Sequence, residues 1–471
     1  MSDSDFLLDE TDTISEASMD LENEETETID INESFIDLLD EDDTIVLIDT
    51  IYELFEEYHR IYILSMASPK FYSDMNEHVS TVIYQDMTNG QLCDLEDYDD
   101  IYEFVETVLD SYLGFSNHKR RSVSYTSMLS MPTVDVEKLR TKIVALQNIP
   151  QPKQKTEEWY KFRYNIISAS NLWKAVSTET NVNSLIYEKC APFSMAQSNF
   201  ANNTGSAMHW GNKYEPVTVM VYEHMYNTKL GEFGCIQHPR HRYIGASPDG
   251  INIDPSNDRY GRMVEIKNIV NREITGVPKE EYWVQTQIQM EVCDLDECDF
   301  VETRFLEYAT EDAFHEDQTH DYKGVVLCFT ERVLINQQVK SNTPLYVYLE
   351  VDVPLTKESL DVWRQQQKEI QKSNNMVLFD THYWYLEEFS CVYIPRNREW
   401  FEDAIPKINE VWNTILKERV EGYEHRAPKK RVLKNQIDVS INSDLNSYSV
   451  KNMPVVNRMC LIKLDEDGNT I

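Results

Sequence analysis

The stretch Ser247–Lys267 limits the fold of this chain more than any other, because a turn after one short apolar run and, beyond a polar loop, a second apolar run place Asp249, Glu265 and Lys267 there. Asp249 lies in a Pro-Asp-Gly turn after the first run, and Glu265 and Lys267 are two residues apart in the second. Alternate side chains of a strand face the same way, so Glu265 and Lys267 emerge together and the turn lets Asp249 fold back beside them. Two carboxylates and an ammonium at one point can hold a divalent cation and position a water molecule.

Taken alone, so short a pattern is more typical of a surface hairpin with scattered charges. Two flanking stretches have apolar residues at helical spacing, and a third carries an arginine seven residues before a serine. The three stretches are His209–Glu223, which carries Glu215; Tyr282–Val292, which carries Gln285; and Glu158–Trp173, which carries Arg163 and Ser170.

In this order the motifs resemble the PD-(D/E)XK nuclease superfamily, and within it the lambda exonuclease and YqaJ-like viral recombinase family. The resemblance covers roughly residues 156–302. It implies an α/β (α+β) fold with a restriction-endonuclease-like core, in which a mixed central β-sheet is flanked by helices. The family motif G-x-x-x-E falls on Gly211 and Glu215, the hairpin aspartate on Asp249, E-x-K on Glu265 and Lys267, Q-x-Q on Gln285 and Gln287, and R-x6-S on Arg163 and Ser170.

The resemblance implies hydrolysis of DNA phosphodiester bonds with Mg²⁺, or with Mn²⁺ as the alternative ion. Lys267 would position the attacking water and stabilise charge in the transition state, and Gln285 would orient that water or the lysine. Glu215 is the least specific of these matches, because a glutamate early in a helix also interacts favourably with the helix dipole. The implied metal ligands are Asp249, Glu265, Glu215 and the backbone carbonyl of Ile266.

Two further residues have a functional and a structural interpretation. In relatives the R-x6-S motif holds a DNA 5′-phosphate, so Arg163 and Ser170 would grip that group through charge-assisted hydrogen bonds. The alternative is that Arg163 pairs with a neighbouring acid, Glu157 or Glu158. His209 is a rival metal ligand, although a histidine satisfied within the fold is the more common case.

The segment Tyr383–Pro406 looks like the C-terminal part of YqaJ-like proteins of large DNA viruses of eukaryotes. Arg396, Arg398 and Trp400 are candidates for DNA contacts. An aromatic-rich segment beside a core more often contributes to packing, and we favour that interpretation.

The charge of the chain is unevenly distributed. The formal net charge is −38, but residues 1–50 alone hold 19 acidic residues and no lysine or arginine. Residues 151–290 hold 15 basic and 14 acidic residues, so the acid lies outside the proposed nuclease core. An acid-rich segment with few apolar residues cannot offset its chain entropy by burial and is expected to be disordered. A short partner-binding helix within this segment is the alternative.

The same patterns predict an organisation in five parts. Residues 1–43 form an acidic disordered tail, 44–115 an acidic helical domain, 116–155 a linker followed by a helix over 136–148, 156–422 the nuclease domain and 423–471 a basic and then mobile tail. The basic residues His118–Arg121 are expected to be exposed linker. Behind the core we expect strands over 300–308, 324–330 and 345–353 and helices over 357–372 and 406–419.

The chain has eight cysteines and no CxxC pair, which favours free thiols in a reducing compartment. It has no run of eighteen apolar residues and no N-terminal apolar signal, so no membrane contact is expected. We therefore expect the protein to be intracellular, either in the host cytoplasm at a viral factory or in the nucleus. Packaging in the virion is an alternative.

The resemblance therefore implies a 5′-to-3′ exonuclease acting on double-stranded DNA ends in viral DNA recombination, repair or replication. It would supply 3′ single strands to a single-strand annealing protein, and relatives form ring-shaped homo-oligomers. Two other classes of function stay open. One is a catalytically silent nuclease fold that binds DNA or protein, and the other is a virion or scaffold protein whose acidic N-terminal region is the working part.

Overall fold

The computed structural model describes residues 39–90, 92–93, 97–115, 121–122, 135–152, 156–192, 206–331 and 344–427. All of these residues belong to the unit Met1–Ala427. Most of the predicted acidic tail (residues 1–38), most of the predicted C-terminal tail (from residue 428 on) and the basic residues 118–120 lie outside them.

The acidic region after the tail is helical, as the apolar spacing predicted. It contains α1 (Glu41–Tyr62), the 3-10 helix η2 (Ile63–Ala67), α2 (Phe71–Asn89) and α3 (Tyr98–Phe115). The Asp40 side chain accepts a hydrogen bond from the backbone N–H of Asp43 at 2.8 Å, which satisfies one of the unpaired groups at the start of α1. The helix therefore starts within the last three residues of the predicted tail.

Arg121 corrects the prediction of an exposed basic linker at that position. Its residue is only 6% exposed, and its guanidinium donates to the carbonyl of Ala67 at 3.3 Å. The guanidinium thus satisfies a backbone carbonyl of η2, a contact between distant parts of the sequence. The following helix, α5 (Val136–Asn148), has the predicted bounds and is capped by Asp135, which accepts from the N–H of Lys138 at 3.1 Å.

A seven-stranded mixed sheet forms the centre of the fold, in agreement with the predicted class. Its order is β2-β5-β6-β7-β10-β8-β9, and only β6 and β7 are parallel neighbours. The strands are β2 (Leu230–Gly231), β5 (Gly250–Asn252), β6 (Met263–Asn268), β7 (Glu297–Glu307), β8 (Lys323–Glu331), β9 (Leu345–Tyr348) and β10 (Met376–Pro395).

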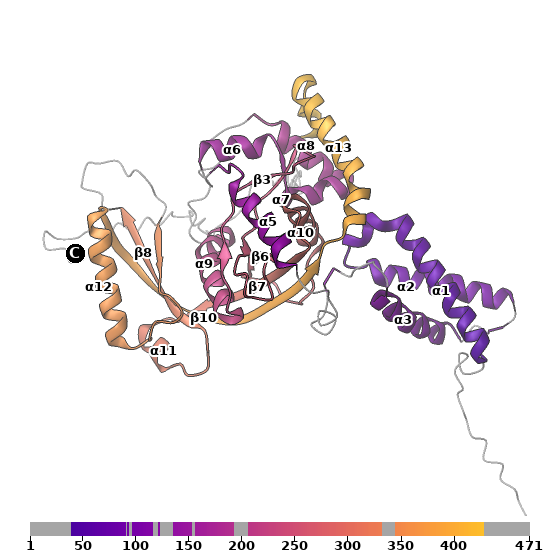
Figure 1. The fold of residues 1–471 in the computed structure, drawn as a ribbon, viewed down its shortest axis with the longest axis horizontal. Helices are drawn as coiled ribbons and strands as arrows, with labels where there is room; N and C mark the ends of the chain where they lie inside the picture. The colour runs from indigo at the N-terminus through magenta and orange to yellow at the C-terminus, as the bar shows by residue number, and fades with distance from the viewer. Residues whose placement is uncertain are drawn as a thin grey trace, which may run out of the picture. The chain divides into compact units, whose positions relative to one another are not determined.

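A second, smaller sheet of three strands has the order β1-β4-β3. Its strands are β1 (Ile167–Ser168), β3 (Ile236–Gln237) and β4 (Ile244–Ala246). In the large sheet the long β10 pairs with β8 through its first part and with β7 through the rest, so it connects the two ends of that sheet (Figure 1).

Helices cover both faces of β6 and β7, because side chains alternate along each strand. Tyr222 of α9 (Ala207–Tyr226) packs with Val264 and Ile266 on one face. On the other face Met263 packs in the main core with Trp283 of α10 (Glu280–Cys293). The helix α10 connects the parallel strands β6 and β7, which such a pair requires. It is buried on all sides from Trp283 to Cys293, so it lacks an amphipathic stripe.

The remaining helices include α6 (Glu157–Tyr164), α7 (Ala169–Leu172), the 3-10 helix η3 (Trp173–Val176), α8 (Glu179–Cys190), α11 (Glu311–Glu316), α12 (Lys357–Ser373), α13 (Arg398–Glu421) and the 3-10 helix η5 (Glu424–Arg426). In the described parts of the chain, none of the helices is long and apolar enough to cross a membrane.

Two predicted boundaries behind the core are wrong. The last helix begins at Arg398 and not at Pro406, because the Asn397 side chain caps it by accepting from the N–H of Trp400 at 2.9 Å. Pro406 lies inside this helix. The strand predicted over 345–353 ends at Tyr348.

Candidate active site

The turn before β5 brings Asp249 to the edge of β6. The antiparallel register pairs Gly250 with Val264, so Asp249 lies just before the first residue of β5 and near the next residues of β6. Its Oδ2 accepts a hydrogen bond from the backbone N–H of Ile266 at 2.7 Å. The N–H and C=O of one strand residue point to the same edge, so the Ile266 carbonyl faces the side of Asp249. The structure thus brings together these two predicted ligands.

Glu265 lies on the opposite face of β6 from Ile266 and is almost fully buried, with 1% of its surface exposed. Its Oε1 accepts from Gln285 Nε2 at 2.6 Å and from the ammonium of Lys267. Its Oε2 accepts from Gln289 Nε2 at 2.7 Å. Both glutamines stand on α10, one turn apart. Three donors therefore fix the orientation of this carboxylate. Gln285 orients Glu265, whereas the sequence predicted that it would orient the water or the lysine.

Gln289 is a site residue that the sequence analysis did not select. Besides Glu265 it binds the carbonyl of Ser247, with Nε2 and the oxygen 3.2 Å apart, and so links β6 to the segment before Asp249. The spacing of four residues from Gln285 was the available signal, because residues four apart share a helix face.

Gln287, the second glutamine of the Q-x-Q motif, points away from the site. Its Nε2 donates to the carbonyl of Pro395 at 3.0 Å, and its Oε1 accepts from the N–H of Asn397 at 2.7 Å. Residues two apart on a helix face different sides. This glutamine therefore holds the junction between β10 and α13.

The charges at the site are unbalanced. Burial alone would lower the pKa of Lys267, but the carboxylates of Glu265 and Asp249 raise it above its usual value, so the lysine is an ammonium. Burial raises the pKa of Asp249 well above its usual range, and Glu265 and Glu215 add to this against the opposite effect of Lys267. Three carboxyl groups and one ammonium thus interact at the site, an arrangement that favours an additional cation.

Glu215 is exposed on α9 and lies on the helix face that passes over the end of β6. The carbonyl of Gly211, one turn before it, accepts from Asn268 Nδ2 at 2.9 Å, and Thr218 donates to Asn268 Oδ1 at 2.7 Å. Because α9 begins at Ala207, Glu215 is beyond the first turn, where a favourable interaction with the helix dipole is concentrated. The dipole therefore does not account for this glutamate.

The donor set fits a hard divalent cation. Among the described residues, no three His, Cys, Asp or Glu side chains are close enough to enclose a metal ion by themselves. Mg²⁺ usually binds through one or two carboxylates and keeps several water ligands, so it does not need such an enclosure. Asp249, Glu265, the Ile266 carbonyl and, through water, Glu215 would be its ligands here.

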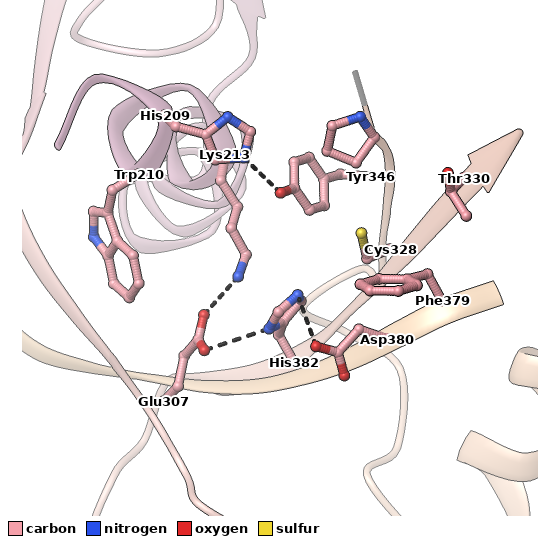
Figure 2. Close-up of a pocket in the computed structure, with 11 residues that line it drawn as sticks. His209, Trp210, Lys213, Glu307, Cys328, Thr330, Tyr346, Phe379, Asp380 and His382 are labelled. Atoms are coloured by element: carbon pink, nitrogen blue, oxygen red, sulfur yellow. Dashed lines mark hydrogen bonds and ion pairs between the residues drawn. The ribbon is translucent and has the colours of Figure 1, made fainter. Parts of the chain in front are cut away.

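His209 lies elsewhere on α9, in a cavity of about 440 Å³ (Figure 2). Its Nε2 is 2.7 Å from the hydroxyl of Tyr346 on β9. In the same cavity Lys213 Nζ is 2.6 Å from Glu307 Oε1. His209 is thus hydrogen-bonded within the fold, as the more common interpretation held, and is not among the residues gathered around Asp249.

Arg163 lies in the last turn of α6, with its guanidinium 4.6 Å from the ring centre of Trp159. Glu157, one of its predicted alternative partners, forms an ion pair with Lys161 at 2.6 Å, and Arg163 has no carboxylate partner among the described residues. The arginine side chain is half-buried, and its charge acts on the thiol of Cys235.

Ser170 is exposed on α7, and its hydroxyl is 3.2 Å from that of Ser168. Ser168 pairs with Gly245 in the parallel β1-β4 ladder, two residues before Ser247. The Ser247 hydroxyl is buried without a hydrogen-bond partner among the described residues. The small sheet therefore places Ser168 beside β4, the strand whose chain continues through Ser247 to Asp249.

Two of the three residues considered for DNA contacts near α13, Arg396 and Trp400, are structural. Arg396 is 5% exposed at its side chain and binds Glu291 and Asp294, the latter at 3.0 Å. Trp400 is fully buried and packs edge-on against Trp283, with ring centres 5.1 Å apart. Arg398 is paired with Asp296. The packing interpretation thus holds for Arg396 and Trp400, whereas Arg398 has an exposed side chain.

Comparisons with known proteins agree with the ordered motifs. Residues 158–296 match the family described as YqaJ-like viral recombinase domain. The protein "Uncharacterized protein R354" of Acanthamoeba polyphaga mimivirus is 28% identical over 312 residues, which are 59% of this chain and 55% of that protein. The chain thus spans about half the length of this curated relative.

Two solved structures are also similar. The alkaline exonuclease LHK-Exo from Laribacter hongkongensis shares 17% identity over 56% of this chain and 94% of its own, with a TM-score of 0.33. A phage-related exonuclease from Haemophilus somnus 129PT shares 14% identity over 62% of this chain and 98% of its own, with a TM-score of 0.26. Scores this low add no argument of their own. Residues 158–296 are thus similar in sequence to the YqaJ-like viral recombinase domain, over the same part of the chain that carries the ordered motifs.

Proposed function

We propose that this chain is a Mg²⁺-dependent deoxyribonuclease, with Mn²⁺ as the alternative ion, that degrades double-stranded DNA from its 5′ ends. The proposal depends on one observation: Asp249, Glu265 and Lys267 lie together at β6, with Asp249 bonded to the Ile266 N–H and Lys267 bonded to Glu265. The match of residues 158–296 to the YqaJ-like family supports it.

A divalent cation held by Asp249, Glu265, Glu215 and the Ile266 carbonyl would supply an activated water and neutralise charge on the scissile phosphate. Asp249 also accepts from the Ile266 N–H, so its carboxylate is oriented before any ion binds. Such preorganisation lowers the reorganisation needed during reaction.

Lys267 provides the cationic group that belongs to the chain itself. Its side chain is 22% exposed, and its ammonium donates to the buried Glu265. An ammonium has three N–H donors and can give the others to the attacking water or to a phosphate oxygen. Gln285 and Gln289 keep Glu265 in place during this exchange.

Arg163 and Ser170 would select DNA ends in this proposal. A guanidinium without a carboxylate partner among the described residues is available for a bidentate bond to a terminal phosphate. Contacts to phosphate position DNA without reading its sequence, so the enzyme would act on ends regardless of base sequence.

The proposal extends to the setting of the reaction. The 3′ single strands left by 5′ digestion are the substrate of a single-strand annealing protein, and a homo-oligomer that encloses DNA would make digestion processive. Within the predicted organisation, 156–422 would be the nuclease domain and the acidic helical part an accessory. A viral relative supports action inside the infected cell, in a viral factory or the nucleus.

The proposal is tested with the purified full chain, Mg²⁺ and two substrates of the same sequence, an end-labelled linear duplex and a covalently closed circle. We expect degradation of the linear duplex alone, with loss of a 5′ label before a 3′ label. Cleavage of the circle would contradict the exonuclease assignment. A chain that binds the duplex but hydrolyses neither substrate would support a silent, DNA-binding nuclease fold.

A further inference from the structure

Two cations anchor the end of α6, the helix that carries Arg163. The Lys189 ammonium, from α8, donates to the backbone carbonyl of Arg163 at 2.9 Å. The Arg419 guanidinium, from α13, donates to the carbonyl of Tyr164 at 2.8 Å. The last carbonyls of a helix have no partners within the helix, and cations there interact favourably with its dipole. The last turn of α6 is therefore fixed by side chains from two other helices.

The two cations are also connected to each other. Arg419 Nε donates to the backbone carbonyl of Lys189 at 2.9 Å, and its guanidinium lies 4.3 Å from the ring centre of Tyr164. Lys189 is buried, with 7% of its surface exposed. In the described part of the chain, neither residue forms an ion pair with a carboxylate, since the adjacent Glu188 pairs with Lys174 at 3.1 Å. A buried ammonium without a paired acid is costly, and the Arg163 carbonyl is the hydrogen-bond acceptor that offsets part of this cost.

Arg163, Lys189 and Arg419 together form a group of three positive charges. Burial lowers the pKa of Lys189 to about 8, and repulsion from Arg163 and Arg419 contributes in the same direction. Both Arg163 and Lys189 also act on the buried thiol of Cys235. Like charges held this close become favourable when an anion binds beside them.

We infer that Lys189 and Arg419 are positioning residues, which hold Arg163 toward a terminal DNA phosphate and set the preference of the protein for 5′-phosphorylated over 5′-hydroxyl ends. The inference rests on the proposed function, in which Arg163 and Ser170 bind the 5′-phosphate. Lys189 and Arg419 act through the backbone of α6 and through the added positive potential at Arg163.

The test compares duplexes of one sequence that differ only in a 5′-phosphate or a 5′-hydroxyl. Binding to the full chain is measured in a chelator, where no hydrolysis occurs, and hydrolysis is measured with Mg²⁺. For Lys189→Met and Arg419→Gln we expect the preference for phosphorylated ends to fall about tenfold, the value of one weakened charge-assisted hydrogen bond. This loss of preference should appear as a higher Kd and KM for phosphorylated ends, with kcat and the Kd for hydroxyl ends unchanged.

Lys174→Met is the matched control, because it removes a nearby lysine that pairs with Glu188 and does not touch α6. It should keep the full preference. Melting temperatures identify variants that fail to fold. If Lys189→Met is unstable, Arg419→Gln still tests the inference, because Arg419 is half-buried and glutamine keeps an amide donor there. An equal loss on both kinds of end would overturn the inference, because a purely structural role predicts it. An unchanged preference, or none in the parent protein, would overturn it as well.

The binding arm separates this inference from the proposed function. If the parent chain prefers phosphorylated ends in the chelator but hydrolyses no DNA with Mg²⁺, the nuclease proposal fails and the positioning role stands. If it hydrolyses both kinds of end equally, the positioning role fails and the nuclease proposal stands.

Discussion

Replacing Gln289 with methionine should slow hydrolysis at a modest cost in stability. The change removes the donor to Glu265 Oε2, at 2.7 Å, and the donor to the Ser247 carbonyl, at 3.2 Å. A hydrogen bond to a charged group contributes about 1.5 to 3 kcal/mol. Glu265 keeps its two donors on Oε1, from Gln285 and Lys267, so we expect the lower end of this range, about a tenfold fall in kcat.

The stability of this variant follows from the other atom of the amide. Gln289 Oε1 is buried without a hydrogen-bond partner among the described residues, and methionine, of similar length, removes that unsatisfied acceptor. The gain offsets part of the lost hydrogen bonding. We expect the free energy of unfolding to fall by about 1 to 2 kcal/mol, since Glu265 Oε2 and the Ser247 carbonyl lose a donor.

Gln287→Met is the matched control, two residues away on the same buried helix. Both amide atoms of Gln287 are bonded, one to the Pro395 carbonyl and one to the Asn397 N–H, so methionine leaves two buried backbone groups unpaired. We expect a stability loss of about 2 to 4 kcal/mol and an unchanged kcat for the folded fraction.

The assay is initial hydrolysis of an end-labelled duplex at saturating DNA, with urea unfolding of each variant measured in parallel. The reasoning is refuted if Gln287→Met lowers kcat as much as Gln289→Met does. It is also refuted if Gln289→Met has the activity of the parent protein.

Three more predictions concern the helix cap, a buried ion pair and the metal. Asn397→Ala should lower the free energy of unfolding by about 1 kcal/mol or more, because it removes the cap of α13; an unchanged urea midpoint would contradict this. Burial opposes the charged form of Glu307, but hydrogen bonds from His382, Lys213 and Tyr214 lower its pKa to about 2. The ionised Glu307 therefore stabilises the folded protein fully above the unfolded pKa near 4.5, and this stabilisation is lost as the pH falls toward 2. Glu307→Gln should make the melting temperature fall less steeply between pH 5 and 3 than it does in the parent protein. A curve of melting temperature against pH that is parallel to that of the parent protein would contradict this. A chelator should abolish hydrolysis, and added Mg²⁺ or Mn²⁺ should restore it, while activity in excess chelator would exclude the metal.

The central part of the site could be predicted because it depends on local geometry. Strand alternation puts Glu265 and Lys267 on one side, and a turn with proline and glycine returns Asp249 to the same strand. Helical spacing similarly located α5 and α9, since their buried apolar residues recur every three or four positions.

The remaining features of the site and the fold could not be predicted, because they depend on contacts between segments that are distant in the sequence. Six positions along α9 turn the helix by about 240°, so His209 and Glu215 face different surroundings although they are close in sequence. The buried Arg121 satisfies a carbonyl of η2, and only the folded chain shows that this carbonyl needs a partner. On α10 every face is buried, so the apolar pattern could not indicate which glutamines point to β6.

The start of α13 was missed for a different reason. Pro406 favours the first turn of a helix, but it is also tolerated farther in when other contacts hold the helix. The stronger signal was Asn397, whose side chain caps the helix three residues before Trp400.

The central claim is that Asp249, Glu265 and Lys267 form a catalytic centre, and the most direct measurement is single-turnover hydrolysis by Asp249→Asn and Lys267→Met beside their duplex affinity. Both changes keep the size of the side chain, so the fold should persist. We predict about a hundredfold to a thousandfold loss of rate, as is typical when a catalytic electrostatic group is removed, with Kd for DNA within a few-fold of the parent protein. Hydrolysis by both variants at the rate of the parent protein would contradict the account.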